Sequence, residues 1–421
     1  MTTSLSAIPI DVIRDHLTHF LTAESCLRLS LTNQSYFHLY QQSDFATTIW
    51  ELFFQMKWRI VYSTNEEYIS CQVKEHPNIW LTRYNHQMKW DADTIALFKM
   101  FLEQGQREDI WELLVHNFYY GIDAVYRIWA TEKSNENKEI LESLLKDMLQ
   151  TRVLCEIGTL VARESKDINM LHIQKLPVLL AKLVDWKLPL QNYDIFISLE
   201  KYVDQELNTL AEILQTTLHQ RNPSCRDGCY PILSIIEAMK TIFKSPSETN
   251  QNEVGSTSLP EFSFSTKEEA SSSPFVGNSI NYYAVSNSTI HKVLFFRTGI
   301  PITLSIIYAA IVRRATGVHL EPLGIPGHFL LSTVVSDEQT NTEERIFIDA
   351  FDGGSTMTLN DVKQMLLVNF EVTWDNRFLT PLTNIEICNR MVLNIMRCQD
   401  LKDSIIYLLF KFLSQNSRED S

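Results

Sequence analysis

An almost uninterrupted apolar segment, Ile302 to Ala315, most restricts how this chain can fold. A helix that is hydrophobic on all sides has to be buried in the interior of a domain. The preceding residues, Thr298 to Pro301, are typical of a turn into a helix, and Gly317 suits a C-terminal cap. The sequence therefore predicts a domain built around one central helix.

Two β-rich segments follow this helix, at His328 to Val335 and Arg345 to Phe351. A polar segment, 336–344, separates them, which predicts an antiparallel hairpin. If the loop is symmetric, facing residues have numbers that sum to about 680. His328 then faces residues 349–352, where Asp349 and Asp352 lie.

A histidine and an aspartate on neighbouring strands can form a catalytic pair, because the carboxylate fixes the tautomer of the imidazole. Papain-like and transglutaminase-like enzymes add a cysteine at the N-terminus of a buried helix. Here Thr303 and Ser305 are the hydroxyl groups in that region, and no thiol is present. We expect both hydroxyls to bond back to helix carbonyls, so that His328 and Asp349 hold the hairpin together in a pseudo-active site. A hydroxyl nucleophile is the alternative.

The rest of the chain is predicted to be mainly helical, since glycine and proline are scarce, at 12 and 13 residues. Residues 75–245 alternate apolar and charged positions at helical spacing, with breaks near 132–138 and 220–230. Residues 8–58 predict closely spaced short helices. About fifty residues form a small core, so an exposed apolar face there favours a partner. Residues 245–274 are rich in Ser, Thr and Glu and are expected to be a disordered linker.

Composition argues against several functions. A net charge of −14 opposes nucleic-acid binding. Residues 300–312 are too short to cross a bilayer, and we expect no membrane segment or signal peptide. The seven scattered cysteines do not form a disulfide framework, which favours a reducing compartment. Cys225, Cys229 and His219 lack the fourth ligand of a zinc site, so we expect no metal and no cofactor.

Two segments resemble known families. Ile8 to Ile13, Phe20-Leu21, Leu27 to Leu31 and Trp50 resemble an F-box. Residues 297–305, Arg-Thr-Gly-Ile-Pro-Ile-Thr-Leu-Ser, resemble the SirB1-type transglutaminase-like domain, as do Glu321-Pro322, His328 to Leu331 and Ile348 to Phe351. The chain thus resembles F-box proteins that carry a SirB1-type domain. Family members commonly continue into a module like hemimethylated-DNA-binding domains, and we expect this chain to lack it.

The resemblance implies a role in ubiquitin ligation. F-box helices dock on a Skp1-type adaptor that links to a cullin–RING ligase, and the rest of the chain selects a protein substrate, here unknown. His328 and Asp349 match the His and Asp of the family, and the nucleophile position near Pro301 is not Cys. By position, the adaptor face or its supporting core would include Pro9, Ile13, Leu17, Phe20, Leu27 and Leu29.

The predicted fold is mainly α with a small α+β domain. The expected parts are an F-box at 1–58, a helical region at 59–244, the linker at 245–274, and at 275–421 a transglutaminase-like, papain-like domain with a short antiparallel sheet. The expected function is a non-catalytic substrate-recognition subunit of a Skp1–cullin–F-box ligase, in the cytoplasm or nucleus. The alternatives are a hydrolase or acyl-transfer enzyme using His328 and Asp349, and a scaffold with a decayed F-box.

Overall fold

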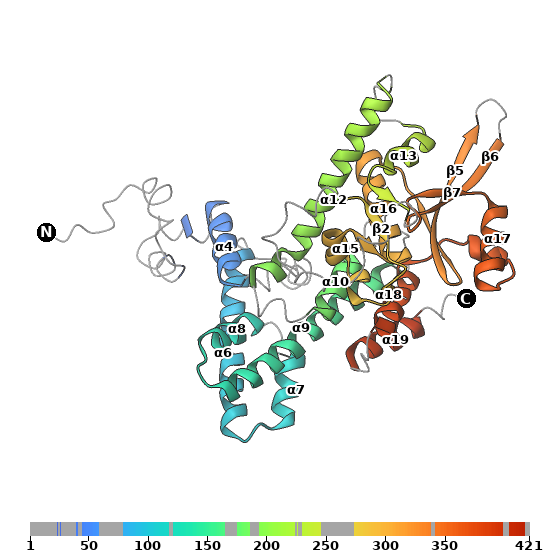
Figure 1. Ribbon diagram of the computed structural model, residues 1–421. Coiled ribbons are helices and arrows are strands. Elements are labelled where there is room, and N and C mark those ends of the chain that lie inside the picture. The colour runs from blue at the N-terminus through green and yellow to red at the C-terminus, as the bar shows by residue number, and fades with distance from the viewer. Residues whose placement is uncertain are drawn as a thin grey trace. The chain divides into compact units, whose positions relative to one another are not determined.

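The computed structural model divides into two compact units, Met1–Arg152 and Val153–Ser421, which are described separately (Figure 1). The structure describes residues 23, 26, 39–40, 44–58, 79–117, 121–164, 175–185, 193–223, 225, 230–245, 273–337, 342–398 and 404–416. The predicted linker lies outside these residues except Ser245, Ser273 and Pro274. Within the described ranges, no helix is long and apolar enough to cross a membrane.

The first unit is helical, as predicted. It contains α4 (Asp44–Lys57), α6 (Ile79–Glu103), α7 (Glu108–Asn117) and α8 (Ile122–Thr131). The long helix α9 (Asn135–Glu164) begins in this unit and ends in the second. The predicted break near 132–138 coincides with the gap between α8 and α9, so helical periodicity located this boundary correctly.

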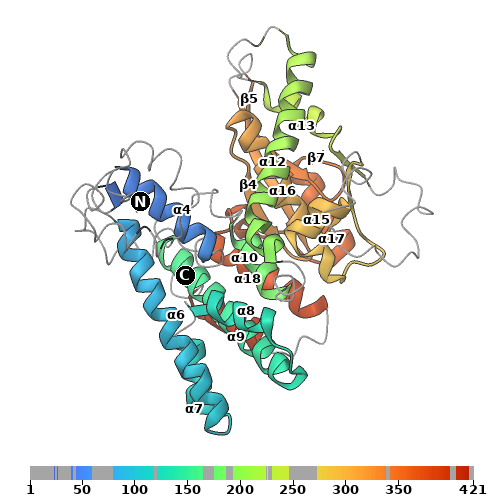
Figure 2. The same ribbon diagram turned by 90° about the vertical axis from the view of Figure 1, so that its left-hand side faces the viewer.

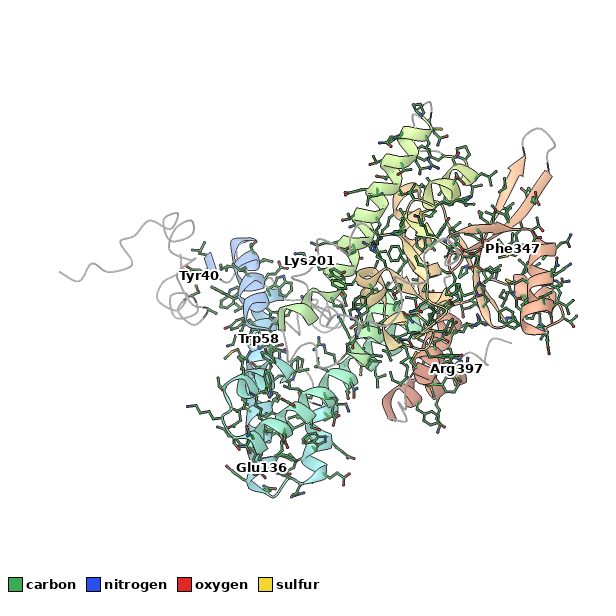
Figure 3. The ribbon with its side chains drawn as sticks, viewed as in Figure 1. Tyr40, Trp58, Glu136, Lys201, Phe347 and Arg397 are labelled. Atoms are coloured by element: carbon green, nitrogen blue, oxygen red, sulfur yellow. The ribbon has the colours of Figure 1, made fainter. Side chains whose placement is uncertain are left out.

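An aromatic cluster joins α4 to α6. Trp50, Phe54 and Trp58 are buried, and the ring centroids of Trp50 and Trp58 lie 5.1 and 4.8 Å from that of Tyr84. Trp58 is labelled in Figure 3. Rings packed edge to face at this separation stabilise a core beyond the area that they bury.

One buried carboxylate connects three helices of this unit. Asp91 on α6 accepts a 2.8 Å hydrogen bond from the indole N–H of Trp58 and forms an ion pair with Arg127 on α8. Its side chain is only 8% exposed, so these donors compensate for the desolvation of its charge.

The second unit is built around α16 (Pro301–Thr316), the predicted central helix. Residues on every face of this helix are buried. Gly317 caps its C-terminus with φ of +74°, in the left-handed conformation that glycine adopts most easily. The helix packs against α12 (Tyr193–Arg221), α15 (Ile290–Phe296) and strand β5 (Figures 1 and 2). The apolar pattern predicted this burial correctly.

A four-stranded antiparallel sheet covers α16. Its order is β4 (Glu321–Ile325), β5 (His328–Asp337), β6 (Thr342–Asp349) and β7 (Ser355–Met357). The register pairs Leu331 with Ile348 and Val334 with Arg345, within one residue of the predicted hairpin. Alternate side chains face opposite ways: Leu331 and Ile348 join the core around α16, and Leu330 and Phe347 join a second cluster with α17 (Leu359–Phe370).

Some elements were not predicted. The chain pairs β1 (Phe243–Lys244), β2 (Phe275–Gly277) and β3 (Thr298–Gly299) in a small parallel sheet, so Thr298 begins a strand and not only a turn. The hairpin between β4 and β5 was also missed. The remaining elements are α10 (Lys175–Val184), α13 (Ile232–Met239), η9 (Val285–Asn287), η10 (Asn376–Leu379), α18 (Asn384–Cys398) and α19 (Ser404–Asn416).

Two buried polar contacts fix the elements before α16. Arg297, at the C-cap of α15, lies 3.5 Å from Glu206 on α12, and its guanidinium lies over the ring of Phe275. Burial lowers the pKa of Arg297, and Glu206 partly offsets that effect. His291 is buried 3.3 Å from Asp185, next to α10, and burial lowers its pKa. These contacts tie α12 and α10 to the segment that leads into α16.

We predict that replacing Asp91 by Ala lowers the free energy of unfolding of the first unit by about 2–3 kcal/mol, because it removes the acceptor of a buried indole N–H and the partner of Arg127. Urea unfolding followed by tryptophan fluorescence measures this. Asp109→Ala, which breaks an exposed pair with Arg107, is the control and should leave the midpoint unchanged. Equal effects of the two substitutions would show that Asp91 has no special role.

Candidate functional site

A histidine–aspartate pair lies at one end of the four-stranded sheet. His328 is the first residue of β5 and Asp349 is the last of β6, and Nε2 of His328 lies 2.7 Å from Oδ2 of Asp349. The side chains are 11% and 9% exposed. Since Asp349 engages Nε2, the other ring nitrogen, Nδ1, is left for the pocket that His328 lines. The two residues thus meet as the hairpin pattern suggested.

The carboxylate is held in place by the turn after β6. Its Oδ1 accepts hydrogen bonds from the backbone N–H groups of Phe351 at 3.0 Å and Asp352 at 3.3 Å. The ring of Phe351 lies edge-on to the imidazole, with centroids 6.0 Å apart. Asp352 is exposed and contacts Ser245, so Asp349 is the partner of His328.

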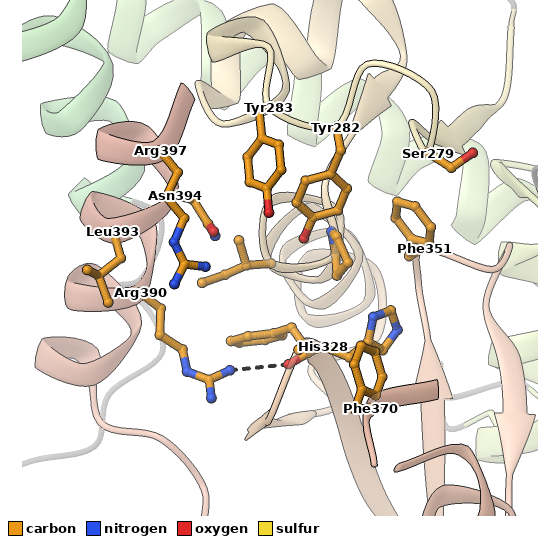
Figure 4. Close-up of a pocket in the computed structure, with 14 residues that line it drawn as sticks. Ser279, Tyr282, Tyr283, His328, Phe351, Phe370, Arg390, Leu393, Asn394 and Arg397 are labelled. Carbon is orange, nitrogen blue, oxygen red and sulfur yellow. Dashed lines mark hydrogen bonds between the residues drawn. The ribbon is translucent and has the colours of Figure 1, made fainter. Parts of the chain in front are cut away.

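Arg390 on α18 fixes the backbone on the other side of His328. Its guanidinium donates to the carbonyl oxygens of Ile325 and His328, each at 3.2 Å (Figure 4). Burial lowers the pKa of Arg390, and Glu386 partly offsets that effect. Gly324 permits this close approach, because a Cβ at that position would lie 2.8 Å from Cζ of Arg390.

The turn between these carbonyls is Pro326-Gly327. Gly327 has φ of +72°, which fits the third residue of a type II turn after proline. A Pro-Gly pair between two apolar segments was the signal by which the β4–β5 hairpin could have been found.

The N-terminus of α16 faces the same pocket as His328. Pro301 and Ile302 line it, and the N-cap residue Ile300 makes no side-chain hydrogen bond to the first turn. A helix N-terminus carries partial positive charge and unpaired N–H groups. Neither Pro301 nor Ile302 has a nucleophilic atom. The site therefore has the base and its orienting carboxylate, without a reacting group at the helix end.

The two hydroxyl candidates lie elsewhere. Thr303 and Ser305 are fully buried, and neither lines the pocket. The prediction that they bond back to helix carbonyls was wrong, since neither hydroxyl has a hydrogen-bond partner among the described residues. The residue four positions before Thr303, Gly299, ends strand β3, and its carbonyl accepts the backbone N–H of Asn278.

The pocket has a volume of about 680 Å³ (Figure 4). Helix α18 forms one wall of the pocket, and Tyr282 and Tyr283 lie above the pocket in this view. His328 and Phe351 lie on the side away from α18. Four of its residues form a stripe on α18 that the sequence analysis did not identify: Arg390, Leu393, Asn394 and Arg397. Their i, i+3, i+4, i+7 spacing, which places side chains on one helix face, was the available signal.

The cysteines with described side chains lie outside this pocket. Cys388 is buried in the core, and Cys398 lies 3.8 Å from the hydroxyl of Ser288, where burial raises its pKa. Nδ1 of His219 lies 2.7 Å from the phenol of Tyr230, and Cys229 is outside the described residues. Among the described residues, no cluster of three or more His, Cys, Asp or Glu side chains could hold a metal ion.

The predicted adaptor residues all lie outside the described residues: Pro9, Ile13, Leu17, Phe20, Leu27 and Leu29.

A thiol placed at the helix end should become reactive. We predict that Pro301→Cys is alkylated by iodoacetamide at pH 6.5 about tenfold faster than the same cysteine in Pro301→Cys/His328→Ala, because the imidazole and the helix N-terminus stabilise a thiolate. Mass spectrometry of the peptide that contains residue 301 separates this thiol from the native ones. Equal rates in the two variants would mean that the imidazole does not reach the helix end.

Part of the chain is similar to known proteins. The family model of the transglutaminase-like superfamily matches residues 202–393, from α12 to α18. F-box only protein 21 of Homo sapiens is 39% identical over 94 residues, which cover 22% of this chain and 15% of that protein. The same protein of Mus musculus is 38% identical over 94 residues, again 15% of its length.

A bacterial protein is also similar. The UPF0162 protein of Xylella fastidiosa strain 9a5c is 29% identical over 125 residues, which cover 29% of this chain and 42% of that protein. The matches thus span less than half the length of each of these relatives. No solved structure matches the chain significantly. The chain is therefore similar to F-box only protein 21 and carries, at residues 202–393, a domain of the transglutaminase-like superfamily.

Proposed function

We propose that this protein is a substrate-recognition subunit of a Skp1–cullin–F-box ubiquitin ligase, and that its transglutaminase-like domain binds a protein substrate without reacting with it. The similarity to F-box only protein 21 and the F-box-like pattern of residues 8–50 support the first part. The composition of the pocket supports the second.

One observation carries the non-catalytic reading. His328 and Asp349 face a helix end whose pocket-lining residues are Pro301 and Ile302, neither of which can act as a nucleophile. Acyl transfer through a covalent intermediate needs an activated nucleophile within reach of the base. Thr303 and Ser305 are buried away from the pocket. The hydroxyls that do line it, on Ser279, Tyr282 and Tyr283, come from the segment before α15 and not from the end of α16. What remains is a shaped cavity on a rigid core, which suits recognition.

The N-terminal segment, residues 1–58, supplies the proposed link to the ligase. Amphipathic helices that lay an apolar face into a groove of a partner are a common docking mode. We assign this face to residues 1–58, with Leu17 and Phe20 among its contacts. The net charge of −14 favours a protein partner over nucleic acid, and we place the protein in the cytoplasm or nucleus.

The domain limits proposed from the sequence are 1–58, 59–244, 245–274 and 275–421. The packing of α12 on α16 and the family match from residue 202 favour extending the last domain to include α12, across the Ser-rich segment. The buried contact of Arg297 with Glu206 supports the same extension, because it joins the motif before α16 to α12.

The adaptor test compares matched substitutions. Wild-type chain should capture purified Skp1, and Leu17→Asp and Phe20→Asp should each weaken capture by about tenfold or more, since a buried carboxylate at an apolar interface is costly. Leu367→Asp, at an exposed position of α17, is the control and should leave capture unchanged. Failure of the wild-type chain to capture Skp1 would remove the ligase proposal and leave the scaffold.

A hydrolase or acyl-transfer enzyme is the second candidate, favoured by the intact contact between His328 and Asp349. It requires labelling of the wild-type chain by a fluorophosphonate probe that disappears in His328→Ala. We expect no such labelling, with the Thr303→Ala variant as a further comparison. His328-dependent labelling would replace the non-catalytic proposal by an enzymatic one.

A further inference from the structure

The walls of the pocket differ in charge from the chain as a whole. Its lining includes Arg390 and Arg397, and no aspartate or glutamate lines it among the residues that the structure describes, although the chain has a net charge of −14. Asp349 contacts His328 from outside the lining, and Glu386 accepts hydrogen bonds from Thr383. A cationic cavity on an acidic protein selects for an anionic ligand.

The two arginines have different roles. Arg390 already donates to the carbonyls of Ile325 and His328, so it fixes the wall of the pocket. Arg397 lies two helical turns further along α18, which corresponds to about 10 Å along the helix axis. Its side chain is exposed, and it forms no ion pair with an acidic side chain among the described residues; its electrostatic neighbour is the phenol of Tyr282. Arg397 is therefore the cation that is available to a ligand.

The other walls are apolar. Aromatic and aliphatic side chains from six segments surround the cationic groups: Tyr282, Tyr283, Phe329, Phe351, Phe370, Ile302 and Leu393. The volume of about 680 Å³ falls in the range of typical ligand pockets, about 300–1,000 Å³. The uncapped N-terminus of α16 adds partial positive charge at Ile302. A ligand that fills this space has a negative group next to an apolar one.

We infer that the pocket binds a peptide carboxylate flanked by an aromatic or large aliphatic side chain, presented by the protein substrate. The inference rests on the proposed function for the choice of a peptide. The free guanidinium of Arg397 matches the single charge and the two oxygens of a carboxylate, which it can bind in a bidentate manner. A doubly charged phosphate would require a second uncommitted cation, and Arg390 is engaged by backbone carbonyls.

The test uses the full chain and fluorescein-labelled peptides. The first pool is Ala-Ala-Glu-Z-Ala-Ala-amide, where Z is an equal mixture of Phe, Tyr and Leu. Two matched pools replace Glu by Gln or by phosphoserine. A further pool, Ala-Ala-Ala-Z, ends in a free carboxylate, and its counterpart is amidated at the C-terminus. Fluorescence anisotropy gives the dissociation constants. The Glu pool distinguishes a side-chain carboxylate from a chain-terminal one.

We expect one carboxylate pool to bind about tenfold or more tightly than its amide counterpart, and Arg397→Gln to abolish that difference. Arg377→Gln is the control, because Arg377 is exposed on η10 and pairs with Asp375 outside the pocket. The inference would be overturned if both variants lost the preference for a carboxylate, or if the wild-type chain showed no such preference. Tighter binding of the phosphoserine pool, or no peptide binding at millimolar protein concentration, would overturn it as well. Peptide binding does not involve the F-box, so this outcome is independent of Skp1 capture.

Discussion

The burial of α16 is the constraint on which the second unit depends. A helix with apolar side chains on every face is stable only if other elements cover it completely, and here α12, α15 and the four-stranded sheet do so. Because these covers come from both sides of the Ser-rich segment, the unit has to bring distant parts of the chain together. Arg297 and Glu206 secure that closure at the point where α16 begins.

The same packing determines what the site contains. Once β5 lies against α16, its first residue, His328, is brought to the helix's N-terminal end, and the β6 partner Asp349 follows from the register. The protein thus keeps the geometry that an acyl-transfer enzyme needs to activate a nucleophile. The chemistry at the helix end differs, since Pro301 and Ile302 supply shape and no reactive atom. In our proposal the α18 wall of the pocket determines which ligand binds: Arg390 positions the backbone of Ile325 and His328, and Arg397 faces the ligand.

The sequence predicted the central helix and the β5–β6 hairpin because each depends on a local pattern: an all-apolar helix and two β-rich segments joined by a polar loop. The hairpin pattern also predicted that His328 lies near Asp349, since the antiparallel register follows from a symmetric loop. It did not predict the small parallel sheet, whose strands are two or three residues long and are joined across long segments. The stripe from Arg390 to Arg397 was missed because its spacing resembles an ordinary amphipathic helix, and only tertiary packing turns it towards His328.

The central claim is that this domain recognises its substrate and does not react with it. The most direct measurement is the release of ammonia from a glutamine-containing peptide by the purified wild-type chain, in the presence and absence of a primary amine, with His328→Ala as the reference. The account predicts that both chains release ammonia at the uncatalysed rate. Release by the wild-type chain above that of His328→Ala, with a rate proportional to protein concentration, would contradict it.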